Sequence, residues 1–105
     1  MFYLEEEQFP KPENPMEISS HPAKFSNDIV VEIKADTEDH CIIVLTNHSG
    51  RIRRMMGVNL IRGTNDIHVE NVDTLEAGLY QLSVKNTEST LLYTSILTKP
   101  WTSFT

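Results

Sequence analysis

The sequence predicts an all-β fold of about seven short antiparallel strands that pack as two sheets. Apolar residues recur at every second position, which is the period of a half-buried strand and not of a helix. Turn-forming residues separate these alternating runs at intervals of about 8 to 12 residues, the spacing typical of sandwiches. The chain has 105 residues, which suffices for one such domain but not for a barrel enzyme or a two-domain enzyme.

Seven segments carry the strand pattern, and turn residues bound each of them. The expected strands are 16–20, 28–34, 41–47, 51–61, 65–70, 79–85 and 90–98. The first is expected to be an edge strand because Pro22 follows it and cannot donate to a ladder. The unbroken apolar run 41–45 predicts a strand covered on both faces. Gly57 interrupts the fourth segment and predicts a bulge or bend there.

Segment 75–84 combines a turn, a corner and an alternating strand. Gly78 has the backbone freedom for a sharp turn into the strand. After it, Tyr80, Leu82 and Val84 fall on one face. The spacing Leu-x-x-Gly-x-Tyr matches the corner of Greek-key sandwiches, in which the tyrosine hydroxyl bonds to the preceding loop backbone. The expected fold class is therefore an Ig-like Greek-key β-sandwich.

Composition and charge argue against several classes of function. The net charge of -6 disfavours general nucleic-acid binding. The longest apolar run, 41–45, is far too short to span a membrane, and the acidic start of the chain lacks the basic region of a secretory signal. The single cysteine, Cys41, lies in that apolar run, which favours a buried and unreactive thiol.

No arrangement of residues predicts catalysis, a metal site or a cofactor. The four histidines have no metal-ligand spacing, and no nucleophile motif is present. A sandwich of this size also has little concave surface on which paired carboxylates could face each other. The chain is therefore expected to be non-enzymatic and to need no cofactor.

Charge is distributed unevenly along the chain. Residues 1–15 combine prolines with glutamates and are expected to form an acidic arm or linker, followed by the sandwich at 16–99 and a short tail at 100–105. Residues 40–65 contain no acid, and their charged residues are Arg51, Arg53, Arg54 and Arg62. One interpretation is a patch that binds a carboxylate-rich or phosphate-rich partner. The alternatives are that the arginines discourage pairing at an exposed edge, or that the acidic arm covers them.

Four segments, taken in order, resemble the C-terminal sorting domain of the type IX (Por) secretion system. They are 47–52, 60–67, 75–84 and 92–99, and the resemblance covers residues 16–99. That family shows a Gly-Lys/Arg hairpin, a Gly-x-Asn-x-Ile strand, a Leu-x-x-Gly-x-Tyr strand and a last strand ending in a basic residue. The matching positions, called the motif positions below, are Gly50, Arg51, Gly63, Asn65, Gly78, Tyr80 and Lys99.

The resemblance implies an Ig-like sandwich that acts as an address label on a secreted protein. Proteins of an outer-membrane export apparatus would recognise it, and the attached protein would reach the outer membrane, the cell surface or the medium. The motif positions would then have structural roles. The alternative is a stand-alone Ig-like binding or adhesion module that uses exposed strand edges or the arginine patch. A homodimer formed through edge strands is a further expectation.

Overall fold

The computed structural model describes residues 16–101, so the arm expected at 1–15 and residues 102–105 of the expected tail lie outside the described residues. The described chain forms antiparallel strands and one short 3-10 helix. The elements are β2 (Glu17–His21), β3 (Ile29–Ala35), β4 (Asp39–Asn47), β5 (Ile52–Leu60), β6 (Gly63–Val69), η1 (Val72–Thr74), β7 (Gly78–Lys85) and β8 (Leu91–Lys99). The seven expected strands are confirmed, with ends that shift by one or two residues.

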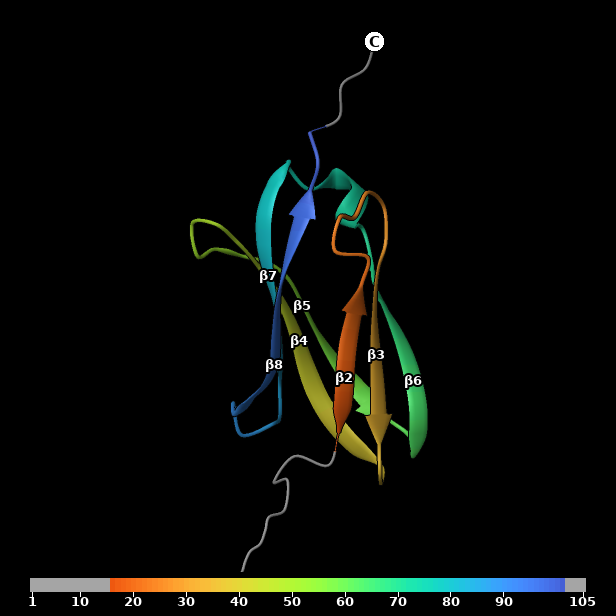
Figure 1. Ribbon diagram of the computed structural model, residues 1–105. Coiled ribbons are helices and arrows are strands. Elements are labelled where there is room, and N and C mark those ends of the chain that lie inside the picture. Colours follow the sequence, from red (N-terminus) through yellow and green to blue (C-terminus); the bar gives the residue numbers. More distant parts are fainter. Residues whose placement is uncertain (1–15, 102–105) are drawn as a thin grey trace, which may run out of the picture.

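The strands form two sheets that face each other (Figure 1). One sheet has the order β2-β3-β6, and the other has the order β5-β4-β7-β8. β3 pairs with β6 and β4 pairs with β7, so each sheet contains a pair of strands that are neighbours in space but not in sequence. This arrangement confirms the Ig-like Greek-key β-sandwich that the sequence predicts. β2 lies at an edge of its sheet, as expected.

Alternating residues of both sheets build one core between them. In β3, Ile29, Val31 and Ile33 are fully buried, while Glu32 and Lys34 point to solvent. The buried core residues are Phe25, Ile29, Val31, Ile33, Ala35, Cys41, Ile43, Leu45, Leu60, Ile67, Val69, Val72, Leu75, Tyr80, Leu82, Val84 and Leu97. Val44 on the outer face of β4 is also buried, so the prediction that this strand is covered on both faces is largely confirmed.

The bulge expected at Gly57 is wrong. Gly57 pairs with Ile42 in a regular ladder, and the register shift lies where Leu45 faces Arg54 and Thr46 faces Ile52. Arg53 is therefore the extra residue, close to the hairpin that joins β4 to β5. A bulge there increases the local twist, and in Figure 1 this hairpin projects away from the two sheets.

The β4–β5 and β7–β8 hairpins use the same device. In the first loop, the Asn47 side-chain oxygen accepts from the backbone N–H groups of Ser49 and Arg51, at 3.0 and 2.9 Å. In the second, the Asn86 side-chain oxygen accepts in the same way from Glu88 and Thr90, both at 2.9 Å. A residue with positive φ then completes each turn: Gly50 at 84° and Ser89 at 69°. Each asparagine thus supplies bonds that the backbone of its own loop cannot make.

The connection between β2 and β3, two strands of the same sheet, also contacts the other sheet. It follows a cis peptide bond between His21 and Pro22. Thr98 of β8 donates its backbone N–H to Ala23 at 2.8 Å, and Phe25 donates to the Thr98 carbonyl at 2.9 Å. This short parallel bridge closes the sandwich between β2 and β8 and carries the Phe25 ring into the core.

Burial of Cys41 produces a measurable pH dependence. Desolvation, with a smaller contribution from the Asp39 charge, raises the pKa of the Cys41 thiol from its ordinary 9.0 to about 11. The folded state therefore holds the proton more tightly than the unfolded state, and the resulting stability is present below pH 9 and lost as pH rises from 9 to 11. We expect this loss to reach about 2–3 kcal/mol.

The measurement is urea unfolding of the native protein and of Cys41→Ala at pH 8 and pH 11. Burial also raises the pKa of Tyr80, which weakens both proteins above pH 10. The difference between them isolates the thiol, and an unchanged difference across this pH range would contradict its burial.

Candidate functional site

The motif positions Gly78 and Tyr80 form the corner that the sequence predicts. Gly78 enters β7 with a φ of 144°, which other residues rarely adopt. The Tyr80 hydroxyl donates to the Glu76 carbonyl oxygen at 2.6 Å. Burial, with a smaller contribution from the Glu76 charge, raises the pKa of Tyr80. The neutral hydroxyl is therefore held as a donor, which fixes the loop before β7.

Lys99 joins the same corner from the last strand. Its backbone pairs with Gly78, and its side chain is 7% exposed. The Nζ atom donates to the Val72 carbonyl at 2.7 Å and to the Asp73 carbonyl at 2.8 Å. It also lies 5.9 Å from the centre of the Phe25 ring, within the range of a cation–π contact. Lys99 thus connects β8 to η1 through the interior of the domain.

Asn65 holds the turn between β5 and β6. Its side-chain oxygen accepts from the Ile61 N–H at 2.9 Å. Its side-chain nitrogen donates to the carbonyls of Ile61 at 3.0 Å and Ile33 at 3.1 Å. Gly63, two residues earlier, has a φ of 106°. These two motif positions therefore lock the turn and tie it to β3.

The motif positions lie at two ends of the sandwich. Gly78, Tyr80 and Lys99 meet at one end, where the hairpin containing Gly50 and Arg51 also lies, because Asn47 pairs with Tyr80. Gly63 and Asn65 lie at the other end, where β6 begins opposite the end of β3. The seven positions therefore do not form one surface site, and six of them hold turns or the corner.

The four arginines do not gather into a single patch. Arg51 precedes β5 and Arg62 follows it, and nine residues of strand separate them by about 30 Å. Arg54 is half-buried, and its Nη2 atom donates to the Asn71 carbonyl at 2.5 Å and to the Thr74 hydroxyl at 3.0 Å. Arg54 therefore ties β5 to the loop around η1, a role that the sequence did not reveal.

No arginine of the described residues forms an ion pair, because the two pairs in this range are Lys34 with Glu17 and His68 with Asp28. The Arg54 side chain donates to carbonyl and hydroxyl oxygens, which have no formal charge, so these bonds do not neutralise its positive charge. The four positive charges along β5 and its flanking turns therefore form no ion pair within residues 16–101, although Asp36 lines the same hollow as Arg62.

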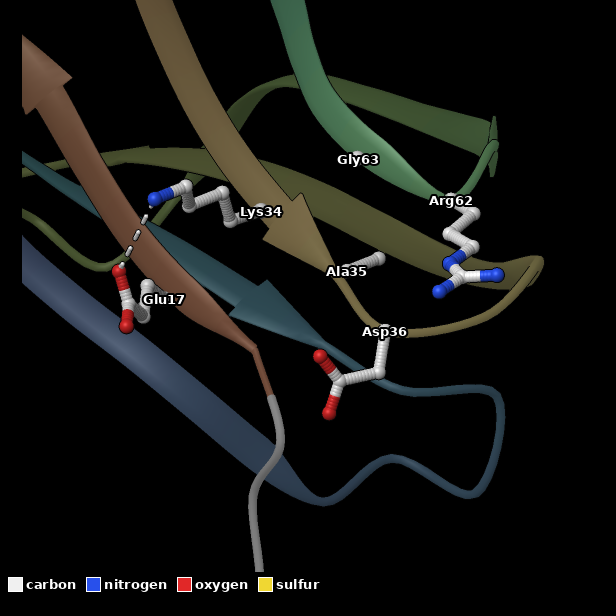
Figure 2. A pocket seen from close by; sticks show the side chains of 6 residues that line it. All are labelled: Glu17, Lys34, Ala35, Asp36, Arg62 and Gly63. Carbon is white, nitrogen blue, oxygen red and sulfur yellow. Dashed lines mark ion pairs between the residues drawn. The ribbon is translucent and has the colours of Figure 1, made fainter.

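An open hollow with a volume of about 410 Å³ lies at one end of the three-stranded sheet. Figure 2 shows Glu17 and Lys34 reaching toward each other from β2 and β3, while Asp36 and Arg62 approach from neighbouring turns. The Glu17–Lys34 ion pair is 3.9 Å long and largely exposed, so it contributes little to stability. Acidic and basic side chains face the same space without convergent buried polar groups, which is not the pattern of a substrate pocket.

Across residues 16–101, no group of three or more His, Cys, Asp or Glu side chains is placed to hold a metal ion. The same residues include no helix with the length and apolar character needed to cross a bilayer.

No family model and no curated protein matches this sequence.

The outer faces of the two sheets differ in charge. On the outer face of the three-stranded sheet, the charged side chains include Glu17, Glu32, Lys34 and Asp66. On the outer face of the four-stranded sheet, the paired positions include one charged side chain, that of Lys85. Several apolar side chains stand exposed on that face: Ile52, Met55, Leu79 and Ile96, each more than half exposed. Such a neutral, partly apolar surface is typical of a contact region.

The edge position of β5 agrees with the alternative that the arginines discourage pairing at an exposed edge, but its uncharged middle was not predicted as a surface. Its sequence reads as a strand, but nothing local shows which strands occupy the edges of a sheet. The available signal is the uncharged stretch 55–61, which lies between Arg54 and Arg62 in a chain that is 23% charged. Within the described part of the chain, β5 pairs with β4 on one side and with no strand on the other.

Proposed function

We propose that this chain is a non-enzymatic sorting module, which directs an attached protein to the export apparatus of the type IX secretion system and to the outer membrane or cell surface. The partners would be protein components of that apparatus. The proposal starts from the ordered resemblance of four segments to the sorting-domain family. It needs neither catalysis nor a cofactor.

The observation that carries the proposal is the coincidence between the motif positions and the residues that hold the sandwich together. Tyr80 and Lys99 secure one end, and Asn65 secures the other. Glycine, asparagine and a corner tyrosine hold turns in many sandwiches, so the support comes from the order of the four segments together with these positions. The coincidence supports a sorting domain as a unit and leaves the recognised surface to be located.

Export of a fused reporter tests the proposal. The full chain is placed at the C-terminus of a periplasmic reporter with its own signal peptide, in a host that has the apparatus and in a strain that lacks it. We expect surface-exposed reporter in the first strain alone. A reporter that stays in the periplasm of both strains would contradict the sorting function.

A variant of a motif position sharpens this test. The Arg51 side chain makes no ion pair within residues 16–101, so Arg51→Gln should lower the surface fraction without unfolding the domain. Arg62→Gln changes the same charge outside the motif positions and serves as the matched control.

A second candidate function is a stand-alone Ig-like binding or adhesion module. The observation that favours it is the neutral outer face of the four-stranded sheet, with Met55 63% exposed and Ile96 61% exposed. Periplasmic retention of the reporter, together with specific binding by the folded chain, would favour this function over sorting.

A further inference from the structure

Most of the outer edge of β5, at residues 55–60, carries none of the usual protection of an edge strand. β5 runs for nine residues, and no strand among residues 16–101 covers its outer side. Residues 55–60 contain no charge and no proline, and the bulge at Arg53 leaves this stretch in a regular ladder with β4. Natural edges usually carry charges, prolines or bulges, because free N–H and C=O groups attract other strands. The exposed backbone of β5 is therefore available for pairing.

The other three edges are less open. β2 has five residues and ends at the cis bond to Pro22. β6 carries Asp66 and is followed directly by Glu70. β8 is closed at Thr98 by the bridge to Lys24, and its Tyr93 hydroxyl shares a 2.9 Å hydrogen bond with Ser20 of β2. Among the described strands, β5 has the longest regular edge without such protection.

Gly57, in the middle of β5, has no explanation within the domain. Its φ lies outside the left-handed region, and a Cβ atom at this position would meet nothing within 4 Å. The fold would therefore accept a larger residue, which would also favour a strand. A glycine in a strand interior often marks close approach by another chain. An aromatic ring of a neighbouring strand can cover such a glycine.

The charges around β5 indicate what kind of strand fits. Arg51 and Arg53 lie at one end of the edge and Arg62 at the other, and none of them forms an ion pair within the described residues. A second β5 running antiparallel would place the arginines of one copy near those of the other, which costs energy. An extended segment with acidic ends would instead neutralise both groups.

We propose that the outer edge of β5 docks an extended segment of a partner protein, with carboxylates near both its ends and an aromatic side chain over Gly57. The segment adds a fifth strand to the four-stranded sheet by backbone pairing. It also covers Met55 on the outer face, next to the neutral surface described above. The inference does not depend on the sorting function and holds equally for a binding module.

The test uses the full chain labelled with ¹⁵N and a synthetic peptide of nine residues. The peptide alternates threonine and valine, with a tyrosine at its centre and an aspartate at each end. We expect saturable binding, and we expect the β5 amide protons that face away from β4 to exchange at least about tenfold more slowly in the complex. The amides of β2 and β8 should keep their exchange rates.

Two control peptides separate the contributions of charge and of the ring. A peptide with lysines at its ends should bind at least about fivefold more weakly at low salt, and added salt should reduce that difference. Arg51→Gln/Arg62→Gln should reduce the preference for acidic ends, and Arg53→Gln added to this pair should abolish it. Lys24→Gln/Lys34→Gln removes the same charge at two positions outside β5 and its flanking turns and should preserve it.

Gly57→Val tests the place of the ring. This variant should be as stable as the native protein or more so, yet bind the tyrosine peptide at least about fivefold more weakly. It should bind a version with a central alanine as the native chain does. Thr94→Val, on β8 of the same sheet, is the matched control and should leave both affinities unchanged.

Three results would overturn the inference. They are the absence of saturable binding up to millimolar peptide, protection that maps to β8 or β2, and a concentration-dependent dimer of the full chain that itself protects β5. The export assay reads a separate property, so a reporter that fails to leave the periplasm would reject sorting and leave strand docking standing.

Discussion

Phe25→Ala is expected to lower the free energy of unfolding by about 3–5 kcal/mol, the cost typical of truncating a fully buried phenylalanine. The Phe25 ring is 0% exposed. It packs edge-to-face against Tyr80, with ring centres 5.7 Å apart and planes at 68°. The substitution therefore removes an aromatic pair and the cation–π contact of Lys99, in addition to opening a cavity. A small domain has about 5–15 kcal/mol of stability in total, so this loss is large.

Urea unfolding followed by far-UV circular dichroism measures the effect. Ile96→Ala also truncates an apolar side chain of the four-stranded sheet, but Ile96 is 61% exposed, so its cost should stay within about 0.5 kcal/mol. If Phe25→Ala does not fold, Phe25→Leu retains most of the volume and should cost about 1–1.5 kcal/mol. Equal costs for the Phe25 and Ile96 variants would contradict the position of Phe25 at the centre of the corner.

Lys99→Met is expected to cost about 2–3 kcal/mol, although methionine preserves most of the apolar stem. Replacement of a whole buried ion pair with apolar residues is often neutral or stabilising. That result requires both partners to be replaced. Here the partners of the Nζ atom are the backbone carbonyls of Val72 and Asp73, which no side-chain substitution removes. Their loss of a donor is therefore not compensated.

The same unfolding experiment measures this loss, and Lys24→Met is the control. Lys24 is exposed, so its replacement should change stability by less than about 0.5 kcal/mol. A Lys99→Met protein as stable as the native one would show that burying the ammonium costs as much as its hydrogen bonds contribute.

Features encoded by local sequence were predictable, and those encoded by distant pairing were not. The Tyr80 corner is local, since its hydroxyl bonds only four residues back. Strand alternation in β3 also predicts which side chains are buried. Lys99, in contrast, bonds to carbonyls 26 and 27 residues away. Nothing near position 99 in the sequence indicates that a lysine would be buried there.

The arginines illustrate the same limit in the candidate site. Their clustering in the sequence predicts a patch, but β5 separates Arg51 from Arg62, and Arg54 bonds to Asn71 across the gap between the sheets. Sheet order decides these outcomes, because it places β5 at an edge and the η1 loop beside it. The Gly57 prediction failed for a related reason: a glycine marks a position of low side-chain bulk, but it does not require the chain to bend.

The contacts of Lys99 make the closed core depend on strand β8. Phe25 lies in the connection between β2 and β3, η1 lies about 50 residues later, and both depend on contacts from the end of β8. Such contacts between distant segments form late in folding, because they require closure of long loops. A nascent chain that stops before residue 99 lacks the groups that close its own core. The folded sandwich therefore marks a polypeptide in which β8 has already been made.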